Sequence, residues 1–152
     1  MKVTIEDFQP FHQQAFKDLN YEWISKYFDV EASDINMLDD PYGYILNKGG
    51  AILIACIDGD PIGTCALIKM EKKIYELAKM AVAPRAQGNQ IGFRLGLKAI
   101  EKAKNLGAES LFLETNSVLK PAIALYKKLG FQESCGHESP YSRCNVQMEL
   151  KL

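Results

Sequence analysis

The stretch IYELAKMAVAPRAQGNQIGFRLG (residues 74–96) places a strand, a loop and a helix in direct succession. Residues 74–82 are strand-like, residues 85–90 form a loop that contains Gly88, and a helix is expected to begin near Ile91. Successive N–H groups of such a loop point outward, and the helix dipole adds about half a positive charge at the first turn. The sequence therefore predicts a mixed α/β domain that binds a phosphorylated cofactor at this loop.

The composition is that of an ordinary globular protein. Of 152 residues, 47% are apolar and 24% are charged, and this length favours one domain that spans residues 1–152. The net charge of −1 creates no field that would attract polyanions, so nucleic acid is not expected as a partner. No apolar run reaches the ~18–20 residues of a membrane span, and the N-terminus lacks the apolar core of a signal peptide. We therefore expect a cytoplasmic protein with no membrane contact.

Cysteine and histidine show no pattern typical of a metal site. The four cysteines have no CxxC spacing, and two of them lie in apolar runs, so reduced and mostly buried thiols are expected: Cys56, Cys65, Cys135 and Cys144. The two histidines, His12 and His137, stand apart in sequence from cysteine or carboxylate ligands. We therefore expect no metal.

The segments before residue 74 predict helices followed by a hairpin. A short strand at 3–5 precedes an amphipathic helix between 11 and 28, because its apolar residues recur at helical spacing. Ser33-Asp34 is a candidate cap for a second short helix that ends before Pro41. The apolar runs on either side of Asp58-Gly59-Asp60 predict two antiparallel strands, and 74–82 would pair as the third.

The segments after the loop predict one further strand, a helix and a closing hairpin. An apolar stripe indicates a helix from Ile91 to the region of Gly107, followed by a strand at 110–114. Residues 115–117 have capping chemistry, and Pro121 suits the first turn of a helix that ends at Gly130. Strands at 131–134 and 144–150 would complete a mostly antiparallel sheet that contains one strand–helix–strand unit.

Two of these segments together resemble a known family. ELAKMAVAPRAQGNQIG (76–92) and LETNSVLKPAIALYKKLGF (113–131) are similar to the two central motifs of the GNAT superfamily of acetyl-CoA-dependent N-acetyltransferases. The resemblance runs from about residue 51 to 131. It implies an α/β (α+β), GNAT-like fold, with a mixed, mostly antiparallel sheet of six to seven strands flanked by about four helices. It also implies acetyl-CoA as cosubstrate, with no metal.

The family pattern Q/R-x-x-G-x-G/A, whose backbone amides hold the pyrophosphate of coenzyme A, aligns with six residues: Gln87, Gly88, Asn89, Gln90, Ile91 and Gly92. Gln87 and Gly92 match the pattern, whereas Gln90 replaces its middle glycine. Any residue type can donate a backbone amide, so we expect a small loss of affinity if position 90 needs a positive φ.

The resemblance also assigns contacts to the rest of the cofactor. The main chain of Met80, Ala81 and Val82 would contact the pantetheine arm, and the amide near Val82 would polarise the thioester carbonyl. Asn116 lies near the start of the helix where many relatives have a cofactor-binding asparagine. The usual spacing would place Leu119 there, so helix capping is the alternative role of Asn116.

Two side chains are candidates for proton transfer. Glu76 lies six residues before Val82, where some family members have a catalytic base, and Glu114 is the reserve candidate. The alternative for Glu76 is a solvated or lysine-paired strand residue. Tyr126 ends the motif AIALY (122–126), whose tyrosine protonates the departing thiolate in the family. Its alternative is core packing.

The resulting hypothesis is an N-acetyltransferase that passes the acetyl group of acetyl-CoA to a primary amine by direct attack in a ternary complex. The acceptor would be a small-molecule or peptide amine. One alternative is a non-catalytic acyl-CoA-binding or regulatory module, and another is a protein (lysine or N-terminal) acetyltransferase. Closing hairpins in this family often mediate dimers, so the resemblance also suggests a homodimer.

Overall fold

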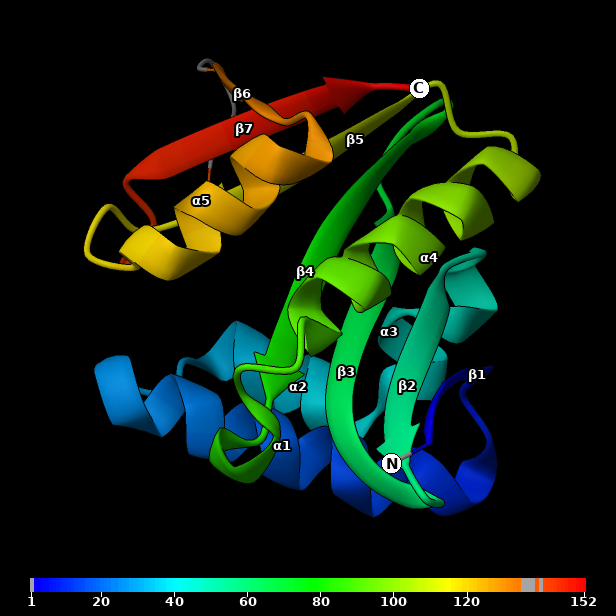
Figure 1. Cartoon of the computed structure of the whole chain (residues 1–152). Helices are drawn as coiled ribbons and strands as arrows, with labels where there is room; N and C mark the ends of the chain where they lie inside the picture. Colours follow the sequence, from blue (N-terminus) through cyan, green and yellow to red (C-terminus); the bar gives the residue numbers. More distant parts are fainter. Residues whose placement is uncertain (1, 135–138, 140) are drawn as a thin grey trace.

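The computed structural model of the chain describes residues 2–134, 139 and 141–152 (Figure 1). Its described part contains a sheet of seven strands in the order β1-β2-β3-β4-β5-β7-β6. Every neighbouring pair is antiparallel except β4 and β5, which are parallel, as the strand–helix–strand unit predicted. The strands are β1 (Val3–Asp7), β2 (Ala51–Ile57), β3 (Asp60–Lys69), β4 (Ile74–Val82), β5 (Ser110–Thr115), β6 (Gln132–Ser134) and β7 (Val146–Lys151).

Helices cover both faces of the sheet (Figure 1). One face carries α1 (Gln13–Tyr27), α2 (Ala32–Asp39) and the four-residue α3 (Pro41–Tyr44), and the other carries α4 (Ile91–Asn105) and α5 (Lys120–Leu129). Short 3₁₀ turns precede or link these elements at Pro10–His12, Leu46–Lys48 and Pro84–Ala86. The architecture confirms the predicted mixed α/β class. None of the helices in the described residues is long and apolar enough to cross a bilayer.

Strand β2 shows why its sequence is almost entirely apolar. Ile52 and Ile54 pack in the core beneath α1 and α2, whereas Leu53 and Ala55 pack in the core beneath α4. A strand that is covered on both faces needs apolar residues at successive positions rather than at alternate ones. The same arrangement holds in β3, where Ala66 belongs to one core and Cys65 to the other.

The parallel pair β4 and β5 is unusually short. Only Ile74–Glu76 of β4 align with Ser110–Phe112 of β5, and beyond these positions the two strands diverge (Figure 1). The rest of β4 pairs with β3 on its other edge. Within the part of the chain that the structure describes, the backbone groups of residues 77–82 that face β5 consequently have no strand partner.

A bulge in β4 lies where the strands diverge. The pairing of β3 with β4 shifts between Thr64 and Ala66, and Lys79 within this step has a φ of +52°. The hydroxyl of Thr64 donates a hydrogen bond to the carbonyl of Lys79 (2.9 Å), and it accepts one from the side-chain amide of Asn20 (3.1 Å). Because Thr64 and Asn20 are buried, these bonds fix the bulge from the side of α1.

One capping prediction is correct in part and another is wrong. Helix α2 begins at Ala32, so Glu31 rather than Ser33 precedes it, and the carboxylate of Asp34 accepts a hydrogen bond from the N–H of Glu31 (2.9 Å). Helix α5 begins at Lys120, and Asn116 does not cap it. Instead, the side-chain oxygen of Asn116 accepts from the N–H of Val118 (2.9 Å), which closes a local turn before the helix.

The substitution Thr64→Val should destabilise the protein by about 1–3 kcal/mol, because the part-buried carbonyl of Lys79 then loses its hydrogen-bond donor. Urea unfolding measures this free energy. The matched control is Thr4→Val on the edge strand β1, whose hydroxyl donates only to the side chain of Glu6 two residues away in the described structure and should matter little. Equal stabilities of the two variants would contradict this role of Thr64.

Candidate active site

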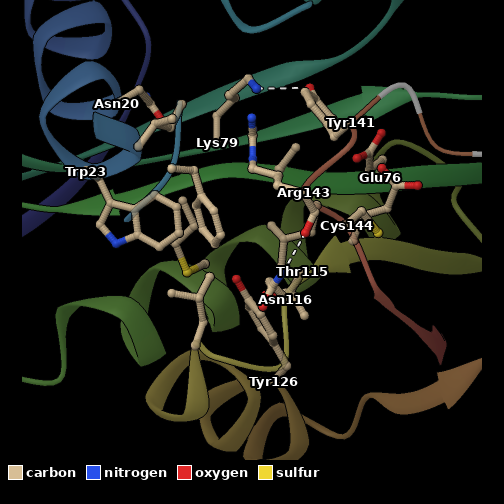
Figure 2. Close-up of a pocket in the computed structure, with 17 residues that line it drawn as sticks. Asn20, Trp23, Glu76, Lys79, Thr115, Asn116, Tyr126, Tyr141, Arg143 and Cys144 are labelled. Carbon is tan, nitrogen blue, oxygen red and sulfur yellow. Dashed lines mark hydrogen bonds between the residues drawn. The ribbon is translucent and has the colours of Figure 1, made fainter. Parts of the chain in front are cut away.

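A pocket opens where β4 and β5 separate, and residues far apart in the sequence line it (Figure 2). Helix α1 contributes Trp23, strand β4 contributes Glu76, and helix α5 contributes Tyr126. Asn116, which follows β5, and Arg143, which precedes β7, complete the lining. The pocket therefore depends on the strand divergence rather than on any one loop.

The pocket connects the two faces of the sheet. Glu76 is aligned with Phe112, and because side chains alternate along a strand, Glu114 lies on the same face as Glu76. Opposite Glu76 on β3 is Ile68, which packs against the core under α1 and α2. Tyr126 approaches from α5 on the other face. A molecule bound through the gap would therefore contact the two carboxylates from one side and the phenol from the other.

The carboxyl group of Glu76 has the properties of a proton acceptor. Burial raises the pKa of Glu76, the charge of Glu114 raises it further and Lys79 opposes them, which gives a value of about 7. Within the described residues, its carboxylate accepts no hydrogen bond. A carboxyl group with this pKa can take up or release a proton near neutral pH.

Glu114 lies nearby but in a different environment. The hydroxyl of Ser139 donates to one carboxylate oxygen (3.0 Å), and the side-chain amide of Gln147 donates to the other (3.2 Å). Both donors are uncharged, so they orient the carboxylate of Glu114 without neutralising it. The structure thus brings together the leading and the reserve candidates for the base.

Tyr126 combines a packing role with a place in the pocket. Its ring packs edge-to-face against Phe131 with centroids 6.1 Å apart, and it also lines the pocket (Figure 2). Burial, with a smaller effect from Cys65, raises the pKa of Tyr126 to about 12, so the phenol keeps its proton. Helix α5 lies close to the start of α4. A Cβ added to Gly92 would lie only 3.1 Å from the side chain of Leu125.

Beside the carboxylates lies a buried ion cluster that no local sequence pattern signals. The carboxylate of Asp34 is fully buried and accepts hydrogen bonds from Lys79 (2.7 Å) and twice from Arg143 (2.8 Å each). Burial alone would raise the pKa of Asp34, but the bonds from Arg143 and Lys79 outweigh it and lower the value to about 2. Lys79 and Arg143 are 45 and 109 residues from Asp34, so only the fold brings them together.

The ion cluster also fixes the segment that precedes β7. Arg143 donates to Glu31 (3.0 Å), and the N–H of Ser142 donates to the same carboxylate (3.1 Å). Lys79 donates to the hydroxyl of Tyr141 (3.0 Å; Figure 2). These bonds join residues 141–143 to the start of α2 and to the bulge of β4.

The loop before α4 contains two residues in the left-handed conformation. Gly88 and Gln90 have φ values of +87° and +57°, so position 90 does adopt the left-handed conformation. This conformation costs a residue with a side chain about 1–2 kcal/mol, and Gln90 bears this cost because it replaces the glycine of the family pattern. The side-chain amides of Gln87 and Asn89 donate to the carbonyls of Val82 (3.4 Å) and Ala86 (3.0 Å) and brace the loop. The first N–H groups of α4 have no acceptor within the helix.

The other predicted cofactor residues lie on both sides of the gap. Met80 lines the pocket, and Ala81 and Val82 complete β4 between the pocket and the loop. Asn116 lines the pocket too, but its side-chain N–H₂ donates to the carbonyl of Arg143. Asn116 therefore supports residue 143, and a cofactor contact of this side chain stays a prediction.

His12 is isolated in the sequence but not in space. Its Nε2 lies 3.6 Å from the carboxylate of Glu6, and Cys56 is close to both. The Nδ1 atom of His12 accepts a hydrogen bond from the N–H of Gln9 (2.9 Å), so in the neutral ring the proton is on Nε2. The nitrogen that faces Glu6 thus has no lone pair for a metal ion.

Cys56, Cys65 and Cys144 are free thiols. Burial raises the pKa of Cys56 to about 11 and that of Cys65 to about 12, so both stay uncharged. Cys135 and His137 lie outside the described residues.

The sequence and the fold both match known proteins. The acetyltransferase (GNAT) family profile matches residues 9–131. The uncharacterized N-acetyltransferase YjgM of Escherichia coli (strain K12) is 36% identical over 98 residues, which are 62% of this chain and 59% of that relative. The chain thus matches less than two thirds of this relative's length.

Solved structures agree over nearly the whole chain. An acetyltransferase of the GNAT family from Staphylococcus aureus Mu50 superimposes with a TM-score of 0.89 at 20% identity and covers 99% of both chains. A Bacillus subtilis acetyltransferase in complex with CoA has a TM-score of 0.76 at 23% identity, again with 99% of both chains covered. At these identities the likeness demonstrates the fold.

The substitution Asp34→Asn should destabilise the protein by roughly 3–5 kcal/mol, because it leaves Lys79 and Arg143 buried with one carboxylate too few. The native protein should also lose stability as the pH falls from about 4 towards 2, because the lowered pKa of Asp34 stabilises the fold only while the group is ionised. This acid dependence should weaken in the variant. Thermal and urea unfolding across this pH range measure both effects.

The control is Asp60→Asn, since Asp60 forms an ion pair with Arg85 in which both side chains are 62% exposed. Its free energy of unfolding should change by less than about 1 kcal/mol. Similar losses in the two variants would contradict the structural role of Asp34.

Proposed function

The chain belongs to the GNAT family of acetyltransferases, and on this basis we propose that it transfers the acetyl group of acetyl-CoA to a primary amine by direct attack in a ternary complex. The observation that carries the proposal is the meeting of Glu76 and Tyr126 in one pocket from opposite faces of the sheet. A proton acceptor and a proton donor on either side of a gap are what direct acyl transfer from a thioester to an amine requires.

The cofactor would lie along the diverging edge of β4. Within the described residues, the backbone groups of residues 77–82 on this edge have no strand partner, and those that no side chain occupies would bond to the amide groups of a pantetheine arm. The N–H groups of residues 87–92 would bind the pyrophosphate at the start of α4. The relative from B. subtilis with bound CoA supports this choice of cofactor. Acetyl-CoA supplies the activated thioester, and the N–H near Val82 would stabilise negative charge on its carbonyl oxygen.

The protein side chains would move two protons. An amine is mostly protonated at neutral pH and cannot attack, so Glu76 accepts one proton from its ammonium group. Tyr126 donates its phenolic proton to the departing sulfur, and the amine's second proton restores the phenol. The raised pKa values of Glu76 and Tyr126 favour these roles, because the first group can accept a proton near pH 7 and the second keeps one.

The alternatives make different use of the same pocket. A non-catalytic acyl-CoA-binding module would need the loop at 87–92 but neither Glu76 nor Tyr126. A protein acetyltransferase would need both, together with room for a polypeptide.

We further propose a cytoplasmic protein, a single domain over residues 1–152 and a homodimer. Gel filtration tests the last.

The substitution Glu76→Gln should lower kcat by about 100-fold or more, because it removes the proton acceptor. In the native protein kcat/KM should fall as the pH drops below about 7, where Glu76 becomes protonated, and the variant should lose this dependence. Tyr126→Phe should have a smaller effect, about tenfold, because a thiolate leaves with little help. Release of free thiol from acetyl-CoA with a panel of primary amines measures the rates.

Calorimetric titration with CoA is the control for cofactor binding, and Glu71→Gln in the exposed turn before β4 is the matched carboxylate control. Unchanged rates in both variants with intact CoA binding would remove the two assigned roles. No thiol release by the native protein with any amine would count against the transferase itself.

A further inference from the structure

The charged groups around the pocket do not balance. The ion cluster contains two cations, Lys79 and Arg143, and two anions, Asp34 and Glu31, so its formal charges cancel. Two further carboxylates, Glu76 and Glu114, line the same pocket. Among the described residues, no lysine, arginine or histidine lies within ion-pair distance of either. When the whole ion cluster is counted with the lining, the described groups around the pocket therefore have an excess of negative charge whenever Glu76 is ionised.

The two cations are already bound to protein groups. The side chain of Lys79 is only 4% exposed, and its ammonium group donates to Asp34 and Tyr141. Arg143 donates two hydrogen bonds to Asp34 and one to Glu31. A ligand carboxylate would have to compete with a fully buried anion for these donors, at a cost in desolvated charge. The cluster is thus a poor receptor for an anionic substituent.

The two carboxylates are placed to receive a cation. Glu76 and Glu114 lie on the same face of the sheet on either side of the gap, close enough for the charge of Glu114 to raise the pKa of Glu76. Ser139 and Gln147 hold Glu114 in one orientation through neutral donors. Trp23 and Phe28 add apolar surface to the same pocket. An ammonium group with an apolar substituent complements this combination in both charge and polarity.

We propose that the acceptor is an aryl- or alkylamine with no carboxylate next to the nitrogen, and that Glu114 binds its ammonium group beside Glu76. This inference rests on the proposed transferase function and adds the acceptor class and a binding residue to it. One proton passes from the ammonium nitrogen to Glu76, while Glu114 keeps the nitrogen in place. The α-carboxylate of an amino acid would lie next to the same two carboxylates and be repelled by them.

Matched pairs of amines with and without an α-carboxylate test the proposal. Tyramine and tyrosine form one pair, and phenethylamine and phenylalanine form the other. With the native protein saturated with acetyl-CoA, kcat/KM should be at least about tenfold higher for the carboxylate-free member of each pair, since one extra repulsion of about 1.4 kcal/mol gives that factor. Equal values, or a preference for the amino acids, would overturn the proposal.

The substitution Glu114→Gln tests the binding residue. It should raise KM for tyramine about tenfold, leave KM for acetyl-CoA unchanged and reduce the discrimination against tyrosine. Glu71→Gln should change none of these values. An unchanged KM for tyramine in a folded Glu114→Gln protein would overturn the role of Glu114. If that variant does not fold, as its thermal unfolding would reveal, the comparison of amine pairs with the native protein still decides the acceptor class.

The outcomes separate this inference from the function on which it rests. Thiol release with a preference for amino acids would leave the transferase in place and overturn only the acceptor class. No thiol release with any amine would overturn both. A higher kcat/KM for the carboxylate-free amines, together with a higher KM for tyramine in Glu114→Gln, is the result that the proposal predicts.

Discussion

The brief pairing of β4 with β5 is the constraint on which the site depends. The two strands are parallel neighbours over three residues each, Ile74–Glu76 and Ser110–Phe112, and then separate. The bulge at Lys79, fixed by the hydroxyl of Thr64, lies in the separated part of β4. Had the pairing continued, the sheet would be closed, and Glu76 and Tyr126 would lie on opposite sides of it without a shared pocket. The divergence supplies the unpaired backbone edge and joins the two faces.

Burial determines how the charged groups beside this gap behave. Asp34 is fully buried yet stays ionised, because Lys79 and Arg143 surround its carboxylate. Glu76 forms no ion pair within the described residues, so burial and Glu114 raise its pKa against the weaker opposing effect of Lys79. The same physical effect, loss of hydration, thus gives one carboxylate a structural role and leaves another able to exchange a proton. The ion cluster already binds the cations that an anionic acceptor would need.

Local patterns in the sequence predicted the parts that depend on neighbouring residues. Strand β4 has the predicted bounds, 74–82, because a charged turn precedes it and Ala83-Pro84 follows it. The two motifs also led to Glu76 and Tyr126, which do share a pocket. The ion cluster escaped prediction because its members are up to 109 residues apart and each looks like an ordinary surface charge. Asn116 was misread as a helix cap, since an asparagine before a helix can equally close a turn of its own.

We propose that acetyl-CoA binds along the edge of β4 that faces β5, with its pyrophosphate at the start of α4. Hydrogen–deuterium exchange of the backbone amides, with and without acetyl-CoA, tests it most directly. Bound acetyl-CoA should slow exchange at residues 80–82 and 87–92, CoA should do the same, and NAD should leave these amides unchanged. Unaltered exchange at both segments in a protein saturated with acetyl-CoA, or the same protection by NAD alone, would contradict the account.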